Sequence, residues 1–192
     1  IKSKYIYPER AMKTNTLPNF LLTAKEINII GPCSIIPEII NLALPSIVID
    51  GGMNHSLVLD NSFSLGDGDS TDKPLDLKLS TRKDQSDLSY ALSLLTSATK
   101  VINLYGFLGK RKDHELINLG EVFSLCEKYP LIAKFEREFL IIPKGAHKLK
   151  INGEFSVMTL RESRLTILGE ARYQLLEETS IGPLSSHGLS NY

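Results

Sequence analysis

Short apolar runs alternate with segments of helical periodicity between residues 27 and 135 of this 192-residue chain. Apolar residues at helical spacing follow three of the runs, as in the pattern Leu88, Ala91, Leu92 and Leu95. The expected strands are 27–30, 47–49, 62–65, 77–80, 101–105 and 131–135, and the other expected helices centre on Ile35, Ile36, Ile39 and Ile40 and on Leu116, Leu119, Phe123 and Cys126. This alternation predicts a parallel sheet covered by helices, with ligands bound by the loops at the carboxyl ends of the strands.

The pattern changes after Pro143-Lys144-Gly145, where helical spacing stops. Asn152-Gly153 separates two runs, 148–151 and 154–160, and predicts a β-hairpin with a tight turn. Two more short strands are expected at 164–168 and 172–176. The predicted class is α/β, with an N-terminal arm (1–25), a Rossmann-like parallel sheet with flanking helices (26–143) and a small antiparallel, β-sandwich-like domain (144–192).

Composition excludes some classes of function. Lys plus Arg and Asp plus Glu are balanced at 22 each, so the chain has no overall positive field for a nucleic acid or an anionic membrane. No run approaches the ~18 apolar residues of a membrane helix. Cys33 and Cys126 lack a Cys or His partner at metal-ligand spacing, and buried, reduced thiols are expected. We therefore expect a cytoplasmic protein that binds neither nucleic acid nor membrane.

Four acidic or glycine-bearing motifs follow expected strands or precede expected helices. They are Asp50-Gly51-Gly52, Gly66-Asp67-Gly68-Asp69-Ser70, Lys83-Asp84-Gln85-Ser86-Asp87 and Gly106 to His114. Asp67 and Asp69 are two residues apart in a glycine-bearing loop and are suitable oxygen ligands for Mg²⁺ beside phosphate. A solvated acidic loop explains the second motif equally well, and Asp-Gly-Gly alone is more often a simple turn.

The last two motifs stand before helices. Ser86 or Asp87 can cap a helix, while Lys83 adds a charge that suits phosphate oxygens. In the fourth motif a basic cluster at 110–112 suits a triphosphate, although a solvated surface loop is the alternative for Lys112. Its spacing is not that of a Walker motif.

In this order, the four motifs resemble those of the thiamine pyrophosphokinase family over residues 28 to 126, with Ser185 to Asn191 similar to the family's Ser-Asn segment. The resemblance implies transfer of a diphosphate group from ATP to thiamine, with Mg²⁺ as cofactor, AMP as second product and a homodimer with shared active sites. It assigns catalysis and metal binding to Asp67, Asp69 and Asp87, ATP or phosphate binding to Asp50, Gly51, Gly52, Lys83, Ser86, Arg111, Asp113 and His114, and thiamine binding to Tyr173, Ser190 and Asn191.

The chain departs from the family pattern at a few points. Gly68 stands where most relatives have a bulky residue, Lys110 replaces a second glycine, and Trp is absent, so Tyr173 is the candidate for stacking on thiamine. Relatives continue into another strand after the Ser-Asn segment, so the last domain is expected to be truncated. Two other functions are compatible with the motifs: a hydroxymethylpterin diphosphokinase, or a catalytically inactive nucleotide- or thiamine-binding regulatory protein.

Overall fold

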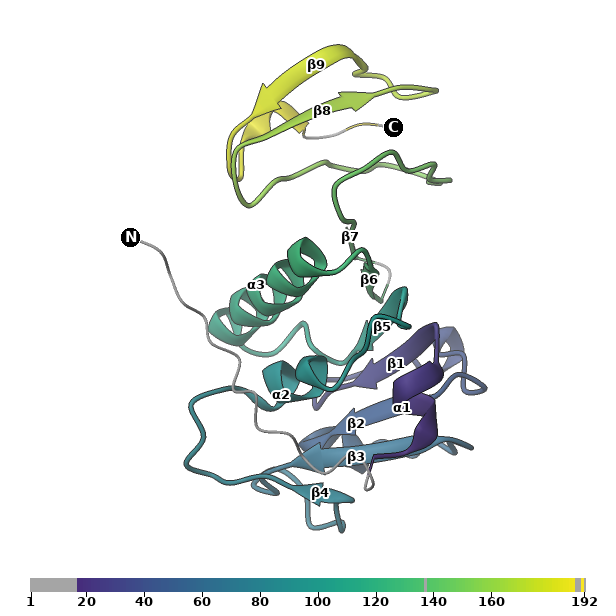
Figure 1. The fold of residues 1–192 in the computed structure, drawn as a ribbon. Coiled ribbons are helices and arrows are strands. Elements are labelled where there is room, and N and C mark those ends of the chain that lie inside the picture. The colour runs from purple at the N-terminus through teal and green to yellow at the C-terminus, as the bar shows by residue number, and fades with distance from the viewer. Residues whose placement is uncertain (1–16, 137, 189–190, 192) are drawn as a thin grey trace. The chain divides into compact units, whose positions relative to one another are not determined.

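The computed structural model describes residues 17–136, 138–188 and 191 (Figure 1). The chain divides into two compact units, Ile1–Lys144 and Gly145–Tyr192. Among the described residues, every helix is too short or too polar to cross a bilayer.

The first unit contains a seven-stranded sheet in the order β4-β3-β2-β1-β5-β6-β7. Its strands are β1 (Glu26–Ile30), β2 (Ser46–Ile49), β3 (Ser62–Gly66), β4 (Leu77–Lys78), β5 (Val101–Tyr105), β6 (Ile132–Phe135) and β7 (Phe139–Ile141). Neighbouring strands from β4 to β6 are parallel, as predicted. The unpredicted β7 is antiparallel to β6, because the three residues between them are too few for a parallel crossover. The sheet is therefore mixed rather than wholly parallel.

Helices α2 (Asp87–Ser93) and α3 (Lys112–Lys128) pack beside each other, α2 against β2 and β3 and α3 against β6 and β7 (Figure 1). The inner face of α3 carries Val122, Leu125 and Cys126, which are buried. The predicted face was wrong at Leu116, which is 71% exposed. Leu116 lies six residues before Val122, and that spacing places two side chains on different sides of an α-helix.

The other face of the sheet is covered by irregular chain. Ile30, Val48 and Tyr105 pack there with Ile40, and segments 35–39 and 53–59 lie against them. The helix predicted around Ile35 to Ile40 is wrong, since only a 3₁₀ turn, η2 (Pro37–Ile39), forms. The connection between β1 and β2 contains three prolines, and its isoleucines are β-branched, so both residue types disfavour a longer helix.

Helix α1 (Asn19–Thr23) lies in the segment that was expected to be an arm without a core of its own. Leu21 of this helix is fully buried in the main core. Residues 17–25 therefore belong to the α/β unit, and the apolar run Phe20-Leu21-Leu22 was the signal for it.

The second unit contains a two-stranded antiparallel sheet formed by β8 (Ser163–Ile167) and β9 (Leu175–Ile181). Strand β9 begins later than the predicted strand at 172–176 and runs further. The hairpin predicted around Asn152-Gly153 does not form, and a single bridge joins Phe155 to Asn191 there. Ile181 and Asn191 are the buried residues in the described part of this unit. The β-sandwich-like arrangement of residues 144–192 stays a prediction.

Three neighbouring strands of the first unit share a buried polar row. Asn28 of β1 is paired in register with Ser46 of β2 and Asn103 of β5. The Asn28 Nδ2 group donates to the Asn41 carbonyl (2.9 Å), and Asn103 Nδ2 donates to Asn28 Oδ1 (3.3 Å). Asn28 is fully buried, so a water molecule cannot take over its hydrogen bond to Asn103.

Replacing Asn28 with alanine is expected to lower the free energy of unfolding by about 1–3 kcal/mol, because Asn103 loses a buried hydrogen bond and keeps only its bond to Glu26. Urea unfolding measures the change. The control is Ser124→Ala, which removes an exposed hydrogen bond to the Gly120 carbonyl and is expected to cost less than about 0.5 kcal/mol. Equal losses in the two variants would show that the polar row contributes nothing specific.

Candidate functional site

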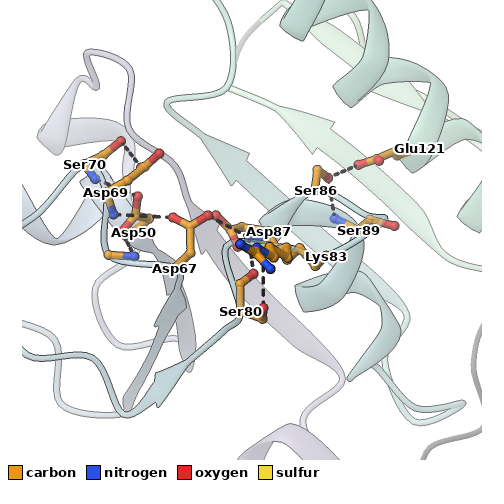
Figure 2. Close-up of polar contacts among 12 residues, drawn as sticks. Asp50, Asp67, Asp69, Ser70, Ser80, Lys83, Ser86, Asp87, Ser89 and Glu121 are labelled. Atoms are coloured by element: carbon orange, nitrogen blue, oxygen red, sulfur yellow. Dashed lines mark hydrogen bonds and ion pairs between the residues drawn. The ribbon is translucent and has the colours of Figure 1, made fainter.

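Asp50 lies directly after β2, as the first residue of the 3₁₀ turn η3 (Asp50–Asn54), with a φ of 41°. Its side chain is buried, with 5% of the residue exposed. The Asp50 Oδ1 atom accepts the N–H of Gly68, and Oδ2 accepts the N–H of Ser70, both at 3.1 Å (Figure 2). The Asp50 carboxylate therefore holds the loop that follows β3, a role that its motif alone did not indicate.

The glycines around Asp50 allow close packing of the loops after β1, β2 and β3. A Cβ atom on Gly52 would lie 2.5 Å from the Ile30 carbonyl oxygen, and one on Gly51 would lie 2.9 Å from Pro32 Cβ. On Gly66 it would lie 2.6 Å from Asp50 Cβ. None of these contacts is compatible with a larger residue unless the backbone shifts. Gly51 and Gly52 thus have a packing role, and phosphate binding by them stays a prediction.

Asp50, Asp67 and Asp69 come together at the carboxyl ends of the adjacent parallel strands β2 and β3. One carboxylate oxygen from each lies within 4.8 Å of the other two. Asp69 Oδ1 also accepts the Ser70 hydroxyl at 2.8 Å. Three hard oxygen donors at this separation fit one divalent cation of the Mg²⁺ type. We call Asp50, Asp67 and Asp69 the carboxylate cluster.

Lys83 links the carboxylate cluster to Asp87, the first residue of α2. The Lys83 Nζ atom lies 2.9 Å from Asp67 Oδ2 and 2.9 Å from Asp87 Oδ1 (Figure 2). The three side chains are 15–19% exposed. Asp87 Oδ1 is buried and is held by this ion pair without a well-directed hydrogen bond. Asp87, predicted as a metal ligand, is therefore joined to Asp67 through an ammonium group.

The charges of this site are interdependent. Burial raises the pKa of Asp50, and the neighbouring Asp69 raises it further. The hydrogen bond from Lys83 is the main cause that lowers the pKa of Asp67. Burial raises the pKa of Asp87 although Lys83 opposes the shift. Burial alone would lower the pKa of Lys83, but Asp67 and Asp87 together raise it. Lys83 is therefore a cation at neutral pH, and Asp67 an anion.

Ser86 caps α2. Helix capping was one of the two roles predicted for it, and phosphate binding was the other. Its Oγ atom accepts the N–H of Ser89 at 2.9 Å and donates to Glu121 Oε2 of α3 at 2.7 Å. Burial raises the pKa of Glu121, against the effect of the Ser86 hydroxyl. Sequence reasoning missed Glu121. The sequence pattern that could have indicated Glu121 is its spacing. It lies three residues after Asn118 and four before the buried Leu125, so all three share one side of α3.

The residues predicted at the start of α3 lie apart from this network. Arg111 donates to both carboxylate oxygens of Asp113, at 3.1 and 2.5 Å, and both side chains are more than half exposed. This bond is the main cause that lowers the pKa of Asp113. His114 is exposed. In the described part of the chain no hydrogen bond or ion pair joins Arg111 or Asp113 to the carboxylate cluster.

The predicted thiamine-binding residues belong to the second unit. Asn191 is 1% exposed, and its Oδ1 atom accepts the N–H of Tyr173 at 2.7 Å. Tyr173 is 53% exposed, with the Arg172 guanidinium 5.4 Å from the centre of its ring. The structure thus brings Asn191 and Tyr173 together, and gives the Asn191 side chain a structural bond. Ser190 lies outside the described residues.

Two cavities open near the loops after β1, β2 and β3. The smaller, about 230 Å³, is lined by Asn54, Asp69, Ser70, Thr71 and Asp72. The larger, about 400 Å³, is lined by Pro32, Ser34, Ile35, Pro37, His55, Ser56 and Leu57. His55, to which the sequence assigned no role, lies 3.0 Å through Nε2 from the Gly31 carbonyl oxygen. The smaller cavity adjoins the carboxylate cluster through Asp69.

No protein-family model and no curated protein sequence matches this chain. Solved structures do share its fold. The thiamine pyrophosphokinase of Bacillus subtilis is 20% identical, with a TM-score of 0.57 over 87% of this chain and 89% of that one. The thiamin pyrophosphokinase of Geobacillus thermodenitrificans is 19% identical, with a TM-score of 0.58 over 86% of this chain and 87% of that one. This chain therefore has an α/β fold like that of two thiamine pyrophosphokinases.

Proposed function

We propose that this protein transfers a diphosphate group from ATP to the hydroxyl group of thiamine, giving thiamine diphosphate and AMP. The observation that supports it most is the carboxylate cluster, with Lys83 beside it, at the carboxyl ends of adjacent strands, where open α/β sheets bind ligands. The fold shared with two thiamine pyrophosphokinases supports the choice of substrate.

The proposed roles follow from the positions of the residues. Asp50, Asp67 and Asp69 would hold Mg²⁺, with Asp87 beside them. A bound Mg²⁺ would neutralise charge on the phosphate oxygens. Lys83 would contact a phosphate oxygen, and the exposed Arg111 is available for the triphosphate. Ser86 would keep α2, and so Asp87, in place through its cap and its bond to Glu121.

In the proposed reaction the thiamine hydroxyl oxygen bonds to the β-phosphorus of ATP and its proton is lost to solvent. The bond from that phosphorus to the oxygen that bridges it to the α-phosphorus breaks, and that oxygen leaves with AMP. Asp67 and Asp69 would hold the cation, which would supply positive charge beside the phosphate oxygens. Tyr173, Ser190 and Asn191 are the proposed contacts of the thiamine rings, and Tyr173 offers its exposed ring for stacking.

The product nucleotide tests this function. With ATP, Mg²⁺ and thiamine, the protein is expected to release AMP in step with thiamine diphosphate, because attack is at the β-phosphorus, whereas an ordinary kinase releases ADP after attack at the γ-phosphorus. Chromatography of nucleotides and thiamine esters measures both products. Chelation with EDTA is expected to stop the reaction, and added Mg²⁺ to restore it.

Each competing function gives a different result in this assay. Release of ADP with thiamine monophosphate would contradict the proposal. Faster turnover of a hydroxymethylpterin than of thiamine would assign the protein to another diphosphokinase. Binding of ATP or thiamine without any turnover would indicate the inactive regulatory protein.

A homodimer is part of the proposal. In the second unit Leu149, Ile151, Met158 and Leu160 are 42–48% exposed, and its sheet has two strands, which is too few for independent stability. Sedimentation at micromolar concentration is expected to show a dimer. A monomer with full activity would contradict shared sites between subunits.

A further inference from the structure

Lys83 occupies an unusual position for a residue that serves only to bind phosphate. Its ammonium group already has two carboxylate partners at 2.9 Å, Asp67 and Asp87, and lies 3.5 Å from the Ser80 carbonyl oxygen. These are the oxygen ligands that a metal ion would receive at the same place. Lys83 thus holds the position of a cation between two of the residues proposed to act with Mg²⁺.

We propose that Lys83 is a resident counter-ion, which keeps Asp67 and Asp87 together before a divalent cation binds and is displaced when the cation arrives. The displaced ammonium then binds an anionic oxygen of the incoming phosphates. This inference rests on the proposed function, since it takes the carboxylate cluster as the metal site. Lys83 would thus pair first with the carboxylates of Asp67 and Asp87 and then with a phosphate oxygen.

Electrostatics favours displacement. Asp67 belongs both to the carboxylate cluster and to the Lys83 ion pair, so a divalent cation bound by Asp67 would lie close to the ammonium. The two like charges repel each other strongly where side chains are mostly buried, and Lys83 is 16% exposed. Both Asp67 oxygens are engaged, since Oδ1 also accepts the N–H of Asp69 at 3.4 Å. A cation bound at Asp67 would therefore approach an oxygen that already has one of these donors beside it.

The local chain allows the lysine to move. Lys83 lies in the irregular segment between β4 and α2, and a lysine side chain has four rotatable bonds. Asp87, in contrast, is fixed as the first residue of α2 next to the Ser86 cap. The ammonium can change partners while the carboxylates stay in place.

Calorimetric titration of the whole protein with Mn²⁺, without nucleotide, tests the inference. The variant Lys83→Met keeps an unbranched side chain, one atom shorter, and removes its charge. It is expected to bind Mn²⁺ about tenfold more tightly than the wild type, because no charge-assisted hydrogen bond has to be broken. A lysine that merely positions the carboxylates would give the opposite result, since its loss would leave affinity unchanged or weaker.

Lys78→Met is the matched control. The end of the Lys78 side chain lies beside Gly68 in the same loop region, 3.6 Å from where a Cβ on that glycine would be, and no ion pair of Lys78 is described. This variant changes the net charge equally, so it measures the general electrostatic effect. The inference requires a clearly larger gain for Lys83→Met than for Lys78→Met.

Acetylation of the wild-type lysines, followed by mass spectrometry, gives a second readout that does not depend on activity. Mn²⁺ is expected to increase the rate of acetylation at Lys83, because its ammonium group is released from the carboxylates. The rate at the exposed Lys100 is expected to stay unchanged. Adding an ATP analogue with a methylene bridge between the α- and β-phosphorus is expected to lower the rate of acetylation at Lys83 again. An unchanged rate at Lys83 when Mn²⁺ binds would overturn the displacement.

The outcomes separate the two proposals. Equal Mn²⁺ affinity in wild type, Lys83→Met and Lys78→Met would overturn the role of Lys83 and leave the proposed function standing. If none of the three proteins binds Mn²⁺ at millimolar concentration, the metal site fails, and the proposed function and the role of Lys83 fail with it.

Discussion

Replacing Asp67 or Asp69 with asparagine is expected to lower turnover by about a hundredfold or more, the scale of losing one preorganised electrostatic group. Asparagine preserves the shape of the side chain and removes the charge that would hold Mg²⁺. The two variants differ in one respect, because Asp67 also pairs with Lys83, whereas Asp69 has no such partner among the described ion pairs. Initial rates of AMP formation at saturating ATP and thiamine measure the loss.

Asp72→Asn is the control for these variants. Asp72 lies in the same loop and lines the smaller cavity, but it does not belong to the carboxylate cluster. Its replacement is expected to change turnover by no more than about threefold, since the charge of an exposed residue is screened by salt. Thermal melting confirms that each variant is folded. Near-normal activity in both folded Asp67→Asn and Asp69→Asn would remove these residues from the mechanism.

Replacing Gly52 with alanine is expected to lower the free energy of unfolding by about 1–3 kcal/mol or more. The new Cβ atom would lie 2.5 Å from the Ile30 carbonyl oxygen, which belongs to the backbone of β1 and cannot rotate away. The shift that relieves this contact also moves Asp50, two residues earlier, so Mn²⁺ affinity should fall as well. Urea unfolding and calorimetry measure the two effects.

Gly120→Ala is the control with the opposite sign. Gly120 lies inside α3, and a Cβ atom there would have no neighbour within 4 Å. Alanine should therefore stabilise the helix by about 0.5–1 kcal/mol, because glycine loses more backbone entropy on folding. A Gly52→Ala variant as stable as the wild type would show that the loops after β1 and β2 are not tightly packed against each other.

Of the departures from the family pattern at Gly68 and Lys110, the one at Gly68 has a local structural basis. Gly68 has a φ of +80°, a conformation that favours glycine, and Lys78 lies beside it. A bulky residue at position 68 would be disfavoured both by this φ and by the neighbouring Lys78 side chain. Lys110 lies on the exposed stretch before α3.

Much of the α/β unit was predictable from local patterns. The buried strands β1, β2 and β5 are runs of isoleucine, valine and leucine bounded by polar residues or turns, and Ser86 before the apolar spacing of α2 predicted its cap. The same patterns predicted that ligands bind at the carboxyl ends of the strands, which is the edge of the sheet where Asp50 and Asp67 lie.

Local patterns failed where a segment had no core to pack against. Asn152-Gly153 favours a hairpin turn, and Gly153 does adopt a positive φ of 105°, but the flanking runs do not pair. A turn preference is worth little when the strands beside it bury few side chains, since ordering the chain costs more than the turn contributes.

The sequence by itself determined the strands β1 to β6, the cap of α2 and the edge of the sheet at which the carboxylates gather, because these depend on periodicity, turn residues and strand direction. Only the tertiary structure decided that Asp50 holds the backbone of the next loop, that Lys83 lies between Asp67 and Asp87, and that Glu121 receives the Ser86 hydroxyl. Those contacts join residues on different loops and helices. Their partners depend on how whole elements pack, which no local pattern along the chain records.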